Sequence, residues 1–534
     1  MSRRIGIAAG IWAVGILLSR VIGLVREAVF GRVVGGGTDA SVYFTAFTIP
    51  DFLNHLLAAG ALSIVFIPLF SRYIAEGNED QGWRAFSSIS TFVGLLAVAV
   101  TALAWLAVPT LDAYFFGQDL DAEALALLDG LTRLVLPAQI FHVLGGLLSA
   151  ALQAKDRHAL PAMAPLVYTG SIIAGGVIGH VYGMGPWGFA WGVVVGSVMG
   201  PFGLPLIGCL RMGLRYRPRL AWDQDLKTYL WQSLPIMLAF SIIMWDDWLI
   251  RLIGVGISDS AIATLSYAKQ IMRVPMGVFG LALGAAAYPT LARLVNQGQL
   301  GDAYTTLSRS LRQMLVLALG AQVAFTVAGE EIARVIYGDR LVVGQHEAIG
   351  QALAVFSLAL WAWAAHSVLA RGFYAMGKTW IPSLLGSGIV LLAWPLYPLL
   401  GGWLGTTGLA VASTLAVSTY VLGLALWLRR SMKEGTDQYG AYIVRIIPAV
   451  AIAIGAGWAV RWGLGAVFDG GLVALLNASM AGTALSAVAG EIAALTQGAV
   501  LCCSALLVYG GAVLALRVPG AIEVVSLIRR KLGR

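Results

Sequence analysis

The stretch from Ser19 to Tyr73 decides the fold of this chain. It begins Ser19-Arg-Val-Ile-Gly-Leu-Val-Arg-Glu-Ala28, passes through Thr38-Asp-Ala40 and Phe47-Thr-Ile-Pro-Asp-Phe-Leu-Asn-His55, and closes on Ile67-Pro-Leu-Phe-Ser-Arg-Tyr73. Two apolar segments here are each long enough to cross a bilayer, yet they carry charged side chains, which cost ~2.5 to 3.5 kcal/mol each at the centre of a membrane helix. We therefore expect these charges to face a protein interior or a wet cavity and to line a pathway for an anionic substrate.

The composition of the whole chain agrees with a membrane protein. Of its 534 residues 59% are hydrophobic and 12% are charged, and the mean hydropathy is +0.81, whereas roughly 25% of the residues in a soluble domain are charged. The net charge of +8 comes from basic residues in short loops, which is a sign of topology rather than of nucleic-acid binding. The three cysteines lie in or beside apolar spans without metal-ligand spacing, so we expect no metal and no cofactor.

Hydropathy predicts an all-α polytopic membrane protein, since a spanning helix needs ~20 apolar residues. Fourteen such spans fall near 6–31, 41–70, 86–109, 129–153, 159–181, 187–210, 228–254, 261–291, 310–329, 350–372, 380–400, 404–428, 441–463 and 495–516. No cleavage site interrupts the first of them, so we expect it to remain in the mature chain. Lys and Arg concentrate in the loops that follow even-numbered spans, which predicts that both termini are cytoplasmic. The basic tail 517–534 is either an interfacial segment attracted to anionic lipid or a solubilising end.

An internal repeat indicates two lobes. Residues 288–293 (Tyr-Pro-Thr-Leu-Ala-Arg) echo residues 67–72, and Ala375–Pro382 echoes Ala154–Pro161, in both cases at an offset of 221 residues. Because this offset covers six spans, the two copies keep one orientation, as in parallel repeats about an axis along the membrane normal. We predict an N-terminal lobe at 1–219, a C-terminal lobe at 220–438 and two appended helices with a basic tail at 439–534, with the substrate site between the lobes.

The first predicted helix contains a candidate phosphate clamp. Arg20 and Glu27 share a helical face, and Gly23 lies between Arg20 and Arg26. A guanidinium offers a planar fork that bonds phosphate oxygens in pairs, which favours binding of a diphosphate. The alternative is an internal ion pair between Arg20 and Glu27 that only makes the helix bundle more rigid.

Two further constellations are expected to line the same cavity. Asp51, Asn54 and His55 follow Pro50, where they form either a polar lining or a local hydrogen-bonded knot around the kink. Lys269 and Arg273 lie one turn apart in the matching part of the second lobe. They either contact substrate or snorkel to the membrane interface.

Acidic residues suggest two other activities. Asp247 and Arg251 are spaced for an i, i+4 ion pair, which leaves Asp246 without an obvious partner. Asp246, with Asp247, is either a candidate for coupling to a proton or sodium ion or a polar contact near the outer interface. Asp223 and Asp225 form a short D-x-D sequence of the kind that glycosyltransferases use to hold a metal. The alternative is that these two acids are ordinary residues of a loop that sets the membrane topology. The chain contains no P-loop sequence, so we do not expect ATP hydrolysis.

Several sequence strings resemble the MurJ (MviN) family of bacterial lipid II flippases, which belongs to the multidrug, oligosaccharidyl-lipid and polysaccharide exporter superfamily. They are Ser19 to Glu27, Thr38-Asp-Ala40, Phe47 to Pro50, Phe66-Ile-Pro68, Ala162 to Pro165, Pro275 to Gly284, Pro289-Thr-Leu291 and Gly372-Phe-Tyr374. The likeness covers the first twelve predicted spans in order.

The resemblance implies inward-to-outward flipping of an undecaprenyl-diphosphate-linked disaccharide-pentapeptide by alternating access. The headgroup would lie in a cationic cavity, and the last two helices would form a groove for the polyprenyl tail. Ser19, Arg20, Arg26 and Asp39 match the family pattern, and Arg20 and Arg26 match arginines needed for function. Asn54 stands where a further cavity arginine is usual, Lys269 and Arg273 replace acids, and no Asp or Asn is present at 380–400 to complete the sodium site of some members.

We therefore predict a lipid II flippase of the bacterial inner membrane, a monomer that contacts its lipid-linked glycan and membrane lipids and no nucleic acid. One alternative is a flippase for another undecaprenyl-diphosphate-linked glycan, such as an O-antigen or exopolysaccharide repeat. The other is a membrane polyprenyl glycosyltransferase, for which Asp223 and Asp225 would be required.

Overall fold

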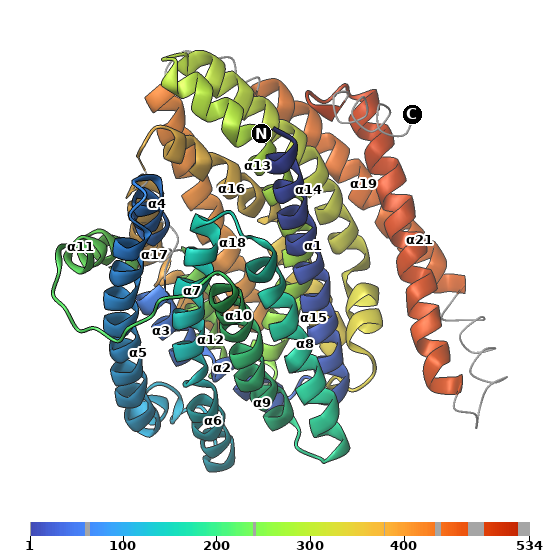
Figure 1. Ribbon diagram of the computed structural model, residues 1–534. Helices are drawn as coiled ribbons and strands as arrows, with labels where there is room; N and C mark the ends of the chain where they lie inside the picture. Colours follow the sequence, from blue (N-terminus) through green and yellow to red (C-terminus); the bar gives the residue numbers. More distant parts are fainter. Residues whose placement is uncertain are drawn as a thin grey trace. The chain divides into compact units, whose positions relative to one another are not determined.

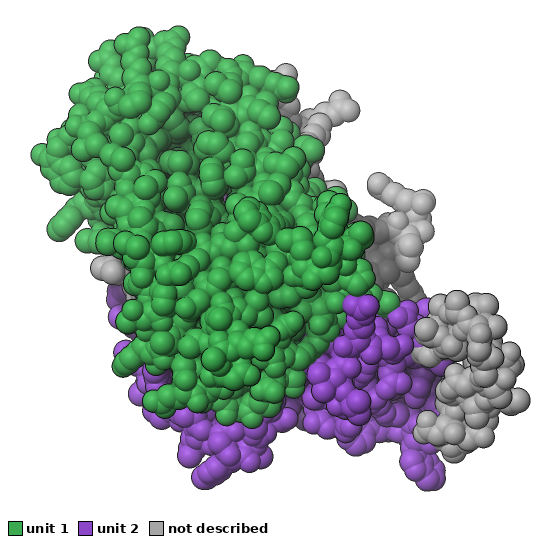
Figure 2. Space-filling view, turned by 90° about the horizontal axis from the view of Figure 1, so that it is seen from below, with its two compact units in different colours: residues 1–240, 251–263 green, residues 241–250, 264–534 purple. Residues whose placement is uncertain are grey.

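The structure is a computed structural model that describes the backbone of residues 2–58, 65–238, 242–378, 380–432, 439–467 and 485–521. Within these ranges the side chains of residues 2–17, 235–238, 242–243, 278–289, 465–467 and 485–490 are not described. The chain forms two compact units, coloured separately in Figure 2. Unit 1 contains Met1–Phe240 and Arg251–Ala263, and unit 2 contains Ser241–Ile250 and Thr264–Arg534.

Unit 1 is built from helices, with a longer non-helical connection at 212–223 (Figure 1). They are α1 (Ser2–Val33), α2 (Thr38–Thr45), α3 (Thr48–Ala58), α4 (Ile67–Ala75), α5 (Glu79–Phe116), α6 (Ala122–Val135), α7 (Ala138–Ala154), α8 (Ala159–Val181), α9 (Pro186–Ser197), a π-helical turn (Val198–Gly203), α10 (Leu204–Arg211) and α11 (Gln224–Leu238). Its core includes Phe66, Phe70, Trp83 and Phe86, which contact one another edge-on or stacked.

Unit 2 is also helical in its described parts. Its helices are α12 (Ile242–Gly254), α13 (Ala261–Asn296), α14 (Leu300–Tyr337), α15 (Gln345–Ser357), α16 (Leu360–Ala375), α17 (Trp380–Ala393), α18 (Leu396–Met432), α19 (Tyr439–Val467) and α21 (Leu485–Ala515). One end of α12 and one end of α13 belong to unit 1. The predicted all-α membrane fold is thus confirmed, while the basic tail 522–534 lies outside the described residues.

The membrane-spanning helices found in the structure match most of the spans predicted from the sequence. Among the described residues eight helices, or continuous helical runs, are long and apolar enough to cross a membrane, and the pair α15 and α16, bent by 41°, makes a possible ninth. They match nine of the fourteen predicted spans. The other five, near 6–31, 41–70, 228–254, 261–291 and 380–400, either include residues outside the described set or correspond to the shorter helix α17. The total of fourteen therefore stays a prediction.

The predicted span at 41–70 is not one continuous helix. Its described residues form α2, α3 and α4, and a break between α2 and α3 follows Thr45. Pro50 has no N–H with which to bond the carbonyl four residues earlier. The hydroxyls of Thr45 and Thr48 donate to the carbonyls of Ser41 and Thr45, at 2.8 and 2.6 Å. Hydropathy alone does not register such a break, because both sides of it are apolar.

The last two described helices of unit 2, α19 and α21, pack on α14. A buried cluster joins Val323 and Val327 of α14 to Ala453 of α19 and to Ala505 of α21, and α19 and α21 lie side by side in Figure 1. The Tyr509 hydroxyl of α21 donates to the Val316 carbonyl at 2.7 Å. The two appended helices are thus held to the unit by a core of their own.

Helices α8 and α9 of unit 1 pack closely through small residues, as is usual between membrane helices. A Cβ atom built on Gly179 would lie 2.6 Å from the Gly188 backbone, whereas one on Gly170 of the same helix meets nothing within 4 Å. We expect Gly179→Ala to destabilise the fold by ~1 to 3 kcal/mol through overpacking. Gly170→Ala should be neutral or stabilising, because alanine favours helix by about 1 kcal/mol over glycine. Thermal unfolding in detergent measures the difference, and equal melting temperatures for the two variants would contradict the close packing.

Candidate functional site

Helix α1 places Arg20, Arg26 and Glu27 within two turns. Arg26 donates from Nε to Glu27 Oε1 at 3.1 Å, and its Nη2 contacts the same oxygen. The Glu27 side chain is 8% exposed and that of Arg26 is 27% exposed, so the guanidinium is the more accessible partner. Ser19 and Arg20 are both half-buried. Glu27 is thus neutralised by its neighbour Arg26, and not by Arg20 as one reading of the sequence suggested.

A cluster of aromatic rings begins one helical turn after the Arg26–Glu27 pair, at Phe30. Phe30 contacts Tyr43 at a centroid distance of 4.5 Å and Phe189 at 4.8 Å. Tyr43 also packs edge-on against Phe47. These contacts join α1 to α2 and α9, which fixes the rotation of α1 and hence the direction of its polar face.

The polar residues of α2 and α3 occupy different environments. Asp39 is exposed in the first turn of α2, where a carboxylate is favoured by the helix dipole. Asn54 is half-buried on α3. Asp51 accepts from Arg251 Nη1 at 2.9 Å, an ion pair within unit 1.

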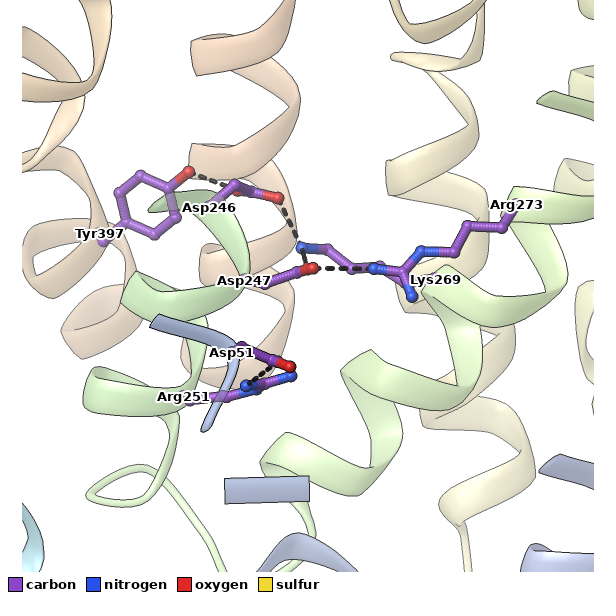
Figure 3. A network of polar contacts seen from close by, with 7 residues as sticks. All are labelled: Asp51, Asp246, Asp247, Arg251, Lys269, Arg273 and Tyr397. Atoms are coloured by element: carbon purple, nitrogen blue, oxygen red, sulfur yellow. Dashed lines mark hydrogen bonds and ion pairs between the residues drawn. The ribbon is translucent and has the colours of Figure 1, made fainter. Parts of the chain in front are cut away.

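Unit 2 holds a buried network of ionised groups between α12 and α13 (Figure 3). The Lys269 ammonium donates to Asp246 Oδ2 at 2.5 Å and to Asp247 Oδ1 at 2.7 Å. Arg273 Nη2 donates to Asp247 Oδ2 at 2.8 Å, and the Tyr397 hydroxyl of α18 donates to Asp246 Oδ1 at 2.5 Å. Asp246 and Lys269 are 1% and 5% exposed. Two acids and two bases thus make a neutral group.

This network corrects two sequence interpretations. The predicted ion pair between Asp247 and Arg251 is wrong, since Arg251 bonds Asp51 and Asp247 accepts from Lys269 and Arg273. Asp246, expected to lack an obvious partner, has Lys269 and the phenol of a helix far along the chain. A long-range partner such as Tyr397 leaves no signal in local spacing. The sequence could not have identified it.

Both acids of the D-x-D sequence form hydrogen bonds that stabilise unit 1. Asp223 Oδ1 accepts from the Leu226 backbone N–H at 2.9 Å at the start of α11, as N-terminal capping residues do. Asp225 accepts from the Tyr73 hydroxyl at 2.8 Å. Burial and this hydrogen bond raise the pKa of Tyr73 above its ordinary value, so the phenol stays a donor. Both carboxylates thus anchor α11, and no group of three or more potential metal ligands occurs among the described residues.

A second charged cluster in unit 2 was missed by sequence analysis. Arg461 of α19 donates from Nη1 to the Val327 carbonyl and from Nη2 to Glu330 Oε2, both at 2.8 Å, and lies 3.0 Å from Glu331 Oε1. It binds α14 where that helix is kinked at Ala328. An arginine inside the predicted span 441–463 was the available signal, because such a charge needs a partner.

The sequence of this chain is similar to those of known proteins. The family model described as "Lipid II flippase MurJ" matches residues 30–476. A "Probable lipid II flippase MurJ" from Rhizobium tropici is 29% identical over 411 residues, which is 74% of this chain and 76% of the relative. A "Lipid II flippase MurJ" from Burkholderia cenocepacia is 25% identical over 459 residues, or 82% of this chain and 87% of the relative.

Solved structures show the same fold. The structure titled "Lipid II flippase MurJ, inward closed conformation" aligns with a TM-score of 0.73 and 19% identity, covering 98% of this chain and 99% of that one. An inward-facing multidrug resistance MATE family transporter of the MOP superfamily aligns with a TM-score of 0.67 and 15% identity, covering 79% of this chain and 98% of that one.

Proposed function

The chain belongs to the lipid II flippase MurJ family, a family of transporters, and on this premise we propose that it moves lipid II from the inner to the outer leaflet by alternating access. Lipid II here means the undecaprenyl-diphosphate-linked disaccharide-pentapeptide that the family resemblance implies. The chain is a multi-pass membrane protein. Its place in the bacterial inner membrane, its cytoplasmic termini and its monomeric state are parts of the proposal.

The observation that carries the proposal is the half-buried Arg26 on helix α1. Arg20 and Arg26 bring two positive charges to this segment, and Glu27 supplies one negative charge. Arg26 gives Glu27 two of its five N–H donors, so the guanidinium keeps donors for phosphate oxygens. A diphosphate is therefore a better counter-charge for α1 than a cationic drug would be.

Ser19, Asp39 and Asn54 complete the proposed substrate contacts of unit 1. Ser19 and Asn54 carry neutral donors suited to phosphate or sugar oxygens, and the carboxylate of Asp39 accepts from sugar hydroxyls or amides. In unit 2 Arg273, whose side chain is 37% exposed, is the better placed of the two predicted bases, because Lys269 is buried against two carboxylates. We propose Arg273 as a headgroup contact and assign Lys269 a different role below.

The proposed organisation follows the repeat in the sequence. Residues 1–219 and 220–438 would be the two moving lobes, and 439–534 an appended pair of helices with a basic tail. What supports the appended pair is the core that α19 and α21 form with α14.

Growth rescue tests the function. We expect this chain to sustain growth of a bacterium whose own lipid II flippase is depleted, because the substrate would reach the outer leaflet again. Immunoblotting of membranes confirms insertion of the chain. Absence of rescue by the intact, inserted chain would contradict lipid II as the substrate.

The residues at three positions favour an alternative substrate. Asn54, Lys269 and Arg273 depart from the residues usual in the family, so the headgroup contacts differ in detail. The alternative is a flippase for another undecaprenyl-diphosphate-linked glycan, such as an O-antigen or exopolysaccharide repeat. Rescue of a strain that lacks a flippase for such a repeat, without rescue of the lipid II strain, would establish it.

A further inference from the structure

The four carboxylate oxygens of Asp246 and Asp247 are all engaged by donors. Lys269 Nζ takes one oxygen of each, Tyr397 takes the other oxygen of Asp246, and Arg273 takes the other oxygen of Asp247. Figure 3 shows the ammonium reaching both acids, with the phenol and the guanidinium on their remaining oxygens. A dissolved cation would therefore have to displace one of these donors.

The ammonium lies where a small cation would be bound. Two carboxylates from adjacent residues bracket it at 2.5 and 2.7 Å, and the Phe356 ring faces it with its centroid at 5.5 Å. Carboxylate oxygens are ligands of hard cations, and an aromatic face attracts positive charge. Lysine presents a compact point charge on a flexible stem. The Lys269 ammonium thus neutralises the two carboxylates as a bound cation would.

We infer that Lys269 is a tethered cation, which fills a monovalent cation site formed by Asp246 and Asp247 and makes this chain independent of sodium at that site. Removing the ammonium should turn the same pair into a sodium site. Asp246 and Asp247 then hold this unit together as a charge-neutral group instead of coupling transport to an ion gradient.

The physical reason is the cost of an uncompensated charge. Removing one partner of a buried ion pair costs ~3 to 5 kcal/mol, because the remaining charge stays out of water. Lys269→Met leaves two carboxylates against one guanidinium. A sodium ion that restores neutrality will stabilise the folded protein as its concentration rises above the dissociation constant.

The first test needs no substrate. Thermal unfolding of purified full-length protein at pH 8 is followed while NaCl replaces choline chloride at constant ionic strength. Wild type should show no sodium-specific change in melting temperature. Lys269→Met should melt lower in choline and regain several degrees in NaCl, with saturation. Lys378→Met, at an exposed lysine, is the matched control and should behave as wild type.

A double variant separates binding from general damage. Lys269→Met with Asp246→Asn leaves Asp247 with Arg273, so it should fold without sodium and show no sodium response. A sodium-specific stabilisation of wild type would overturn the inference. So would a Lys269→Met protein that fails to fold, or gains no stability, even in saturating NaCl.

Growth provides the second readout, and only this part rests on the proposed flippase function. Wild type should rescue equally in low-sodium and high-sodium media, while Lys269→Met should rescue only in high sodium. If wild type fails to rescue at all, the proposed function fails and the thermal result still decides the role of Lys269. Sodium-dependent rescue by wild type would count against the tethered cation.

Discussion

Arg26→Ala is expected to abolish growth rescue and to lower the rate of lipid II flipping in proteoliposomes at least about tenfold. A hydrogen bond between charged groups contributes ~1.5 to 3 kcal/mol, and the planar guanidinium makes two of them with phosphate oxygens. Arg26→Lys should retain part of the activity, since lysine keeps the charge but loses the fork. The rate is measured by the accessibility of fluorescent lipid II to an external reagent.

The loss has two possible causes, because Arg26 also neutralises Glu27. The Glu27 side chain is 8% exposed, and a buried carboxylate without its partner destabilises the fold. Glu27→Gln combined with Arg26→Ala removes both charges. If Arg26 contacts the diphosphate, the double variant stays inactive although its stability recovers. Full activity of the double variant would show that Arg26 serves only its neighbour.

A second arginine of the same helix is the control. Arg32 lies exposed in the last turn of α1, where a cation gains ~0.3 to 1 kcal/mol from the helix dipole. Arg32→Ala should therefore preserve most of the flipping rate. A loss as large as that of Arg26→Ala would indicate that any positive charge on α1 matters and that no defined clamp exists.

The sequence predicted the fold more completely than the site, for a physical reason. Long apolar segments must be helical in lipid, since backbone groups there have no water to bond. This is why the predicted segments are helical over most of their described length. The breaks within segments depend on local chemistry instead. Pro50 gave a visible signal for one, whereas at the kink of α14 near Ala328 the Val327 carbonyl accepts from an arginine more than a hundred residues later.

The pairing of charges was the least predictable part. Local spacing suggested Asp247 with Arg251, and Arg20 with Glu27, because i, i+4 and i, i+7 positions share a helix face. The structure pairs Asp247 with Lys269 and Arg273, and Glu27 with the adjacent Arg26. Which partner each charge takes is decided by the packing of helices far apart in sequence, as with Tyr397 and Asp246.

Arg461→Ala should cause a large loss of stability at a site away from the proposed substrate contacts. This side chain bonds the Val327 carbonyl at the kink of α14 and two glutamates, of which Glu331 is 5% exposed. A side chain inserted at such a point is a recognised cause of helix kinks. Without it Glu331 loses a partner while α21 still covers it, since a Cβ on Gly498 would lie 3.0 Å from the Glu331 Cβ.

We expect Arg461→Ala to cost ~2 to 4 kcal/mol and to release α19 and α21 from α14. Two measurements test the release of these helices: faster proteolysis of the C-terminal part of the chain, and a lower melting temperature in detergent. Arg445→Ala is the matched control on α19, because that exposed arginine bonds one carbonyl, of Arg517, at 2.8 Å, and its loss should change little. Arg461→Lys should fall between the two, since one ammonium cannot span the Val327 carbonyl and both glutamates as the guanidinium does. Equal protease sensitivity of the Arg461 and Arg445 alanine variants would mean that apolar packing alone holds the last helices, and that the charged cluster is dispensable.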